Sequence, residues 1–128
     1  MSEIRKDYLY TKDHEWVKKT SSPKVVTVGI SDFAQSSLGD VTFLQLPAIG
    51  KSLKKGEILG TVESVKAVSD VYAPVSGTVV KINETLNADP AAINSDPFGN
   101  GWLVEMELSS EAEVSTLMSP EAYANVAH

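Results

Sequence analysis

The stretch Gly60-Thr-Val-Glu-Ser-Val-Lys-Ala-Val-Ser-Asp-Val-Tyr-Ala-Pro74 decides the fold. Two β-type runs, Ile58 to Glu63 and Val68 to Ala73, flank the short segment 64–67 and predict a hairpin with a four-residue loop. Lys66 lies in that loop, where a tight backbone would hold its amine clear of the surface. A modifying ligase needs such an exposed amine at a defined place. We therefore interpret Lys66 as the attachment point of a covalently carried cofactor.

The alternative is that Lys66 is a solvated surface charge, as most lysines in turns are. Its neighbours favour the first interpretation. Val65 and Ala67 are apolar although they flank the tip of an exposed turn, which is unfavourable for solubility alone. Recognition of the turn by a second protein would explain why they are there.

Composition narrows the class of function. The chain has 128 residues, enough for one domain with a modest core. Its 17 acidic and 11 basic residues give a net charge of −6, which argues against a nucleic-acid partner. No apolar run is long enough to cross a membrane, and the N-terminal residues have neither secretory nor transit character. These features indicate a cytoplasmic protein.

The chain also offers little for catalysis. It has no cysteine, so it can form no disulfide, thiolate metal site or thiol nucleophile. Of its two histidines, His14 lies two residues before Trp16, and we interpret it as a packed or surface imidazole. No spacing of the acidic residues singles out a carboxylate pair. We therefore expect neither catalytic residues nor a metal site.

Outside the hairpin, apolar residues at every second position predict further strands. Three of these strands cover residues 24–30, 40–46 and 78–83. A last strand runs from Trp102 to Leu108, with Trp102 in the core.

A few helices complete the predicted elements. Ser31 to Gly39 predicts a short helix with Ser31 at its N-cap and the glycine after its last turn. Near the C-terminus, Ser110 and Glu113 form a capping-box pattern, and Ser119-Pro120 begins a final helix. Nothing in that final helix points to chemistry.

Several segments together resemble the glycine cleavage system H proteins. They are Glu63-Ser-Val-Lys-Ala67, Ser69-Asp70, Ala73-Pro-Val-Ser-Gly77, Asp13-His-Glu-Trp-Val17, Val28-Gly-Ile-Ser-Asp-Phe-Ala-Gln35, Leu38-Gly-Asp40, Asn94-Ser-Asp-Pro97 and Gly101-Trp102. The segments follow one another along nearly the whole chain, so the resemblance is far more specific than one lysine motif.

The resemblance implies a mainly β fold. The expected architecture is a flattened β-barrel or sandwich of the lipoyl/biotinyl carrier type, a hybrid barrel-sandwich, with a short helix near 31–38 and C-terminal helices. It also implies a single H-protein domain over residues 1–128, with a lipoyl-binding core over 25–108.

The resemblance further implies that the chain is a carrier and not an enzyme. Lipoate, joined by an amide bond to Lys66, would carry the aminomethyl group from glycine decarboxylase (P protein) to the tetrahydrofolate-dependent aminomethyltransferase (T protein). Dihydrolipoyl dehydrogenase (L protein) would then reoxidise it. A lipoate ligase or a lipoyl/octanoyl transferase would attach the group, and the carrier is expected to be a monomer.

Roles for six further residues follow from the resemblance. A ligase would recognise the loop residues around the lysine, namely Glu63, Ser64, Val65 and Ala67. The loaded arm would fold into a cleft, where Glu15 and Asp70 are placed to hold an ammonium group. The alternative for these last two is an ordinary surface carboxylate.

Other carriers remain as alternatives. Biotin carriers resemble one another in having Met on both sides of the lysine, whereas Val65 and Ala67 flank Lys66 here. Lipoyl domains of 2-oxo acid dehydrogenases usually have Asp directly before the lysine, and Val65 departs from that pattern. A lipoyl or biotinyl carrier serving another complex, including one that relays lipoate, stays open. So does an interaction module whose Lys66 is never modified.

Overall fold

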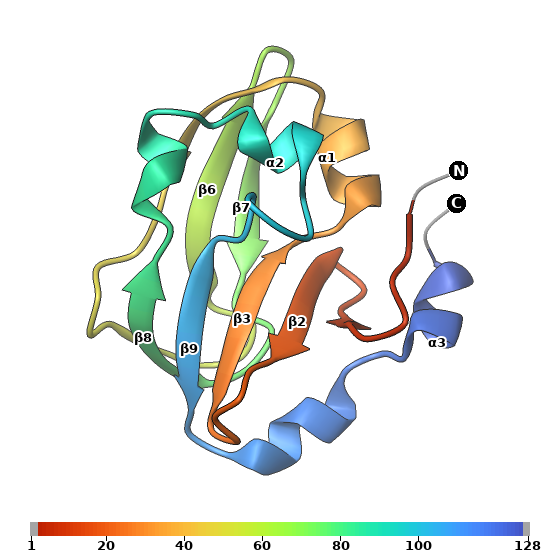
Figure 1. The fold of residues 1–128 in the computed structure, drawn as a ribbon, viewed down its shortest axis with the longest axis vertical. Helices are drawn as coiled ribbons and strands as arrows, with labels where there is room; N and C mark the ends of the chain where they lie inside the picture. Colours follow the sequence, from red (N-terminus) through yellow and green to blue (C-terminus); the bar gives the residue numbers. More distant parts are fainter. Residues whose placement is uncertain (1–2, 127–128) are drawn as a thin grey trace.

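Two antiparallel sheets make up most of the protein (Figure 1). The structure is a computed structural model that describes residues 3–126. Its elements in chain order are β1 (Leu9–Tyr10), β2 (Glu15–Lys19), β3 (Val25–Ile30), α1 (Asp32–Leu38), β4 (Val41–Gln45), β5 (Ser52–Leu53), β6 (Ile58–Ser64), β7 (Val68–Tyr72), β8 (Gly77–Ile82), the 3₁₀ helix η1 (Glu84–Asn87), α2 (Ala92–Ser95), β9 (Val104–Leu108), the 3₁₀ helix η2 (Glu111–Thr116) and α3 (Pro120–Ala124).

The larger sheet has six strands in the order β1-β2-β3-β9-β8-β5, and the smaller has three in the order β4-β6-β7. The smaller sheet carries the β6–β7 hairpin, whose tip lies at the top of Figure 1 beside α1 and α2. The prediction of a mainly β barrel-sandwich with a short helix near 31–38 is confirmed.

The core forms because inward-facing positions alternate along the strands. On β3, Val26 and Val28 are fully buried and pair with Met106 and Val104 of β9, which are buried as well. The smaller sheet contributes Leu44, Val62 and Val71, among others, to the same cluster. Burying these apolar side chains is the main stabilising term, at roughly 25 cal/mol per Å² of surface removed from water.

A second buried cluster is aromatic and ties together distant parts of the chain. It consists of Tyr8, Tyr10, Trp16, Phe98 and Tyr123. Tyr8 meets Trp16 edge-on with ring centroids 5.0 Å apart, and Tyr10 stacks on Tyr123 at 4.4 Å. The Trp16 indole N–H donates to the carbonyl of Pro97 at 3.0 Å. The Tyr10–Tyr123 stack docks α3 against β1, and the Trp16 hydrogen bond ties β2 to the loop before β9.

Two local predictions are wrong. Trp102 precedes β9 and is only partly buried, packed against the aromatic cluster with the Lys81 ammonium 5.7 Å from its ring centroid, and Trp16 is the fully buried tryptophan. Ser110 makes no capping hydrogen bond, and the segment after it is a 3₁₀ helix. The Glu113 carboxylate instead accepts from the Ser76 amide at 2.6 Å and from the Ser76 hydroxyl at 3.0 Å. A tertiary contact has taken the carboxylate that the capping box required.

Two helix caps do form as expected. The Ser31 hydroxyl accepts from the amide of Ala34, and the Ser119 hydroxyl accepts from the amide of Ala122, each at 3.2 Å. Within residues 3–126, no helix is both long enough and apolar enough to span a membrane.

Gly29 is expected to be essential for packing of the aromatic cluster. It lies opposite Trp16 in the β2–β3 pair, and a Cβ atom at this position would overlap the indole ring. Replacing it by alanine should lower the free energy of unfolding by about 1–3 kcal/mol, the usual cost of overpacking. Urea denaturation of Gly29→Ala measures this, with Thr27→Ala on the same strand as the control. Equal unfolding midpoints for Gly29→Ala and the unmodified chain would contradict the packing argument.

Candidate functional site

The β6–β7 hairpin holds Lys66 at a closely specified turn. The strands pair from Ile58 opposite Tyr72 up to Glu63 opposite Val68. Beyond them, the Ser64 amide donates to the Ala67 carbonyl at 2.8 Å. The Ser64 hydroxyl accepts from the amides of Lys66 and Ala67 at 3.3 and 3.1 Å. Ser64 therefore shapes the turn, a task distinct from the recognition role suggested by the resemblance.

The turn is also fastened to the end of α1. The Val65 amide donates to the Asp40 carbonyl at 3.0 Å. Gly39, with φ of +80°, ends the helix, and its missing side chain leaves room for the lysine: a Cβ there would lie 3.3 Å from Lys66 Cε. A larger residue at Gly39 would be strained by its φ and would crowd the lysine stem.

Exposed apolar side chains lie on and beside the lysine turn. Val65 and Val68 are 69% and 66% exposed. Phe43, 53% exposed, pairs with Glu63, which pairs in turn with Val68, so that these three form one row across the small sheet. Phe43 is not among the residues predicted from the sequence. A shift in register between Val41 and Phe43 interrupts the alternation that would have shown which way the phenyl ring faces.

A cleft of about 320 Å³ lies beside the hairpin, between β7, α1 and the turn before β2. Its lining consists of Asp13, His14, Glu15, Ile30, Phe33, Ala34, Ser37, Leu38, Val62, Ala67, Val68, Ser69, Asp70 and Val71. Glu15 and Asp70, which lie far apart in the sequence, thus line one cleft that begins next to the lysine turn. Asp70 is exposed, whereas Glu15 is 2% exposed.

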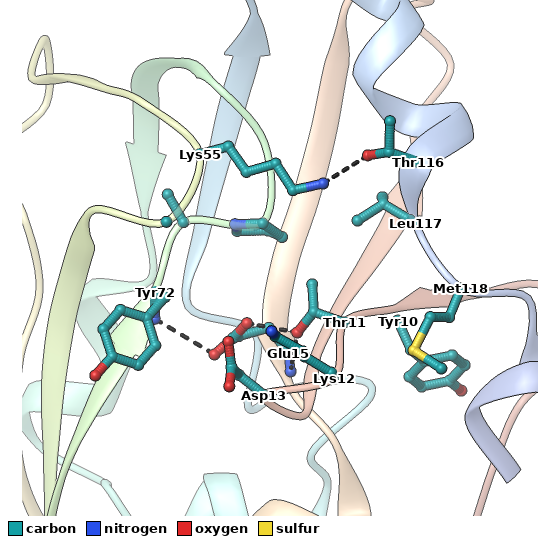
Figure 2. Close-up of a pocket in the computed structure, with 13 residues that line it drawn as sticks. Tyr10, Thr11, Lys12, Asp13, Glu15, Lys55, Tyr72, Thr116, Leu117 and Met118 are labelled. Carbon is teal, nitrogen blue, oxygen red and sulfur yellow. Dashed lines mark hydrogen bonds between the residues drawn. The ribbon is translucent and has the colours of Figure 1, made fainter. Parts of the chain in front are cut away.

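Glu15 bridges the two sheets. Its carboxylate accepts from the Thr11 hydroxyl at 2.6 Å and from the Tyr72 amide at 3.3 Å (Figure 2). Burial raises its pKa to about 7, because these two hydrogen bonds only partly offset the loss of hydration. Glu15 also lines a second cavity of about 340 Å³, which extends toward Lys55 and Met118. The Glu15 carboxyl group therefore lines both cavities, and its charge changes near neutral pH.

His14, next to Glu15, has an unusual backbone and buried partners. Its φ is +73°, and its ring lies 4.5 Å from that of Phe33 between centroids. Nδ1 is 2.6 Å from the Tyr123 hydroxyl. Burial lowers the pKa of the imidazole. The sequence predicted a packed or surface imidazole for His14 and no chemical role for α3, and no local signal in the sequence connects the two.

Within residues 3–126, no group of three or more His, Cys, Asp or Glu side chains is placed to hold a metal ion. The site consists of an exposed lysine on a fixed turn, exposed apolar side chains on and beside that turn, and an adjoining cleft that three acidic residues line.

Comparison with known proteins identifies the family. Residues 8–128 match the family model described as Glycine cleavage H-protein. The chain belongs to this family. The "Glycine cleavage system H protein" of Carboxydothermus hydrogenoformans is 49% identical over 96% of this chain and 93% of that protein. The Listeria monocytogenes protein of the same name is 50% identical over 96% of this chain and 97% of that protein.

A solved structure agrees. The crystal structure of a glycine cleavage system H protein from Mycobacterium marinum superposes with a TM-score of 0.87 at 40% identity, covering 95% of this chain and 97% of that one. Members of the H-protein family are the lipoyl carriers of the glycine cleavage system. The chain is accordingly a carrier component of that system and not an enzyme itself.

The stability of the protein is expected to depend on pH through Glu15. Below a pH of 4.5, the ordinary pKa of the carboxyl, it is protonated in both the folded and the unfolded state. As pH rises to about 7, the unfolded chain loses this proton while the folded chain keeps it, so stability falls and the loss is complete above about 7. The full penalty is roughly 3 kcal/mol.

Urea denaturation from about pH 5 to about pH 8 measures this effect. The Glu15→Gln variant mimics the protonated acid and should become progressively more stable than the unmodified chain as pH rises. Asp89→Asn, an exposed change outside both cavities, is the control. Parallel pH profiles for the unmodified chain and Glu15→Gln would exclude an elevated pKa at Glu15.

Proposed function

We propose that this chain carries lipoate as an amide on Lys66. The observation that carries the proposal is the placement of that side chain: it is exposed at the tip of a hairpin, on a turn that hydrogen bonds to Ser64 and Asp40 hold in place. Within residues 3–126, its ammonium group forms neither a hydrogen bond nor an ion pair. The amine is thus free to be acylated without breaking a contact.

The surroundings suit the attached group as well. The side chain extends past Gly39, where no Cβ obstructs it, and the neighbouring cleft combines apolar walls with the carboxyl groups of Asp13, Glu15 and Asp70. When bound, lipoate supplies a disulfide that can accept an aminomethyl group and be reoxidised. The partners on this proposal are glycine decarboxylase (P protein), aminomethyltransferase (T protein) and dihydrolipoyl dehydrogenase (L protein). We place these reactions in the cytoplasm.

The exposed residues beside the lysine support recognition by a lipoate ligase or a lipoyl/octanoyl transferase. Val65 and Ala67 leave apolar surface open at the turn, and Glu63 supplies one negative charge beside it. Ser64 would act indirectly, by holding the turn in shape.

The arrangement of the two sheets and the hairpin fits one H-protein domain over residues 1–128. The lipoyl-binding core would span 25–108, a range that begins with β3 and ends with β9.

The adjoining cleft would shelter the loaded arm. Asp70 is the better placed partner for a cationic cargo, because its carboxylate is exposed at the cleft. Glu15 lies deeper and is partly protonated at neutral pH. An ammonium group close to it would favour the ionised form and lower its pKa.

Lys66→Arg is expected to abolish lipoylation, because the guanidinium cannot form the amide. Intact mass and peptide mapping of protein from its host should show the lipoyl increment on Lys66 in the unmodified chain and in the Lys51→Arg control. Glycine-dependent decarboxylation should be lost only in Lys66→Arg. In the same host, Glu63→Ala should be lipoylated more slowly. An unmodified Lys66 in lipoate-replete cells would refute the carrier proposal, and a biotin increment would move the chain to another class of carrier.

Asp70→Asn is expected to shorten the lifetime of the aminomethyl-loaded protein several-fold, because a neutral amide holds an ammonium less well than a carboxylate does. Decay of the loaded protein in the absence of T protein measures this lifetime, and Asp89→Asn is again the control. Glu15→Ala, which also removes a cleft carboxyl, should act in the same direction. Unchanged lifetimes in Asp70→Asn and Glu15→Ala would remove both residues from the cargo site.

A further inference from the structure

Three buried or half-buried groups behind the cleft share a chain of hydrogen bonds. The Tyr123 hydroxyl, from α3, lies 2.7 Å from Ser31 Oγ and 2.6 Å from His14 Nδ1. Ser31 and Tyr123 are fully buried. The Ser31 hydroxyl is also the N-cap of α1 and accepts from the Ala34 amide at 3.2 Å. These contacts connect the C-terminal helix to one wall of the cleft.

Only one arrangement of protons satisfies all three side chains of this hydrogen-bond network. Among residues 3–126, Tyr123 is the only group placed to accept the proton of the Ser31 hydroxyl. If Ser31 donates to Tyr123, the Tyr123 proton is free to reach His14 Nδ1, which must then be the acceptor. His14 is in this case neutral and carries its proton on Nε2.

The opposite arrangement leaves a buried donor without a partner. Were His14 to carry a proton on Nδ1, as the other tautomer or as the cation, it would donate to the Tyr123 oxygen. Tyr123 would in turn donate to Ser31, and the Ser31 proton would have no acceptor in a place that water cannot reach. An unpaired buried hydroxyl is costly, so the structure disfavours both forms of His14 that are protonated at Nδ1.

We propose that Tyr123 is a positioning residue that, with Ser31 behind it, holds His14 as the neutral tautomer protonated at Nε2. The basic nitrogen of the imidazole then points at the Tyr123 hydroxyl, and His14, which lines the cleft, carries no positive charge. The direction in which burial moves the pKa of His14 agrees with this.

The charges around His14 show why such a restraint matters. The other ionisable groups that line the cleft are Asp13, Glu15 and Asp70, and Asp32 stands beside Ser31 at the start of α1. All four are acidic, and Asp13 acts to raise the pKa of the imidazole. A cationic His14 would cancel part of the negative potential of the cleft and repel an ammonium cargo. Tyr123 prevents this by keeping Nδ1 engaged as a hydrogen-bond acceptor.

The significance of this arrangement rests on the proposed function, but its test does not require the lipoylated protein. In a His128→Gln background, His14 is the one remaining histidine, and ¹⁵N-detected NMR reports the protonation of each ring nitrogen as pH is varied. We expect the full chain to show an unprotonated Nδ1 and a protonated Nε2 at neutral pH. Tyr123→Phe should give a mixture of tautomers and a higher pKa for His14.

Matched variants separate this effect from a general loss of packing. Tyr10→Phe removes the hydroxyl of the ring that stacks on Tyr123. Among residues 3–126 this hydroxyl forms hydrogen bonds only with the Arg5 backbone, so the variant should leave His14 unchanged. Ser31→Ala removes the proton that sets the direction of the hydrogen bonds from Ser31 through Tyr123 to His14, and it should act like Tyr123→Phe. Ser31→Thr keeps the hydroxyl and should keep the tautomer. Ser31→Ala also carries the test if Tyr123→Phe fails to fold.

The result that overturns the inference is a protonated Nδ1 in the unmodified chain at neutral pH, or an unchanged tautomer in both Tyr123→Phe and Ser31→Ala. Neither result bears on whether Lys66 is lipoylated. In the lipoylated protein, Tyr123→Phe should release its aminomethyl cargo several-fold faster than Tyr10→Phe. Failure to find lipoate on Lys66 would refute the carrier proposal while leaving the state of His14 as measured.

Discussion

The side-chain amide of Asn94 fixes the place at which the lysine turn can stand. Its NH₂ group donates to the carbonyl of Gly39 at 2.8 Å and to the Gln35 side chain at 3.0 Å, and its oxygen accepts from the Val41 amide at 2.9 Å. One residue of α2 thus holds the end of α1 and the start of β4 together. The carbonyl between them, that of Asp40, receives the Val65 amide. The position of Lys66 therefore depends on a helix that follows it by almost thirty residues.

Local sequence was sufficient for the elements whose hydrogen bonds are local. The hairpin, α1 and the cap at Ser119 all follow from residues within a few positions of one another. The capping box at Ser110 was wrong because Glu113 found the Ser76 amide, a partner that no local pattern reveals. Trp102 was misplaced for a similar reason: the alternation of apolar residues begins before β9, although the paired strand begins only at Val104.

The functional site, too, could be predicted from the sequence only where one continuous segment forms it. Lys66 and its neighbours could be found from sequence because the hairpin is a continuous segment. That Glu15 and Asp70 line one cleft was suggested by resemblance and not by spacing. The depth of Glu15, its contact with the Tyr72 amide and its elevated pKa follow from the packing of one sheet on the other. The contact between His14 and Tyr123 joins positions 109 residues apart, beyond the reach of any local pattern.

The anchoring of the turn by Ser64, Asp40 and Gly39 has a consequence for how a carrier serves several enzymes in succession. Because the backbone at Lys66 is held in place, the attached group samples only the volume that the rotatable bonds of the lipoyl-lysine side chain allow around one point of the surface. Once a partner docks within that volume, delivery becomes an intramolecular event whose rate depends on effective concentration and not on the bulk concentration of the carrier. A loose hairpin would dilute the same group over a larger space, so rigidity at the base is what makes mobility at the tip productive.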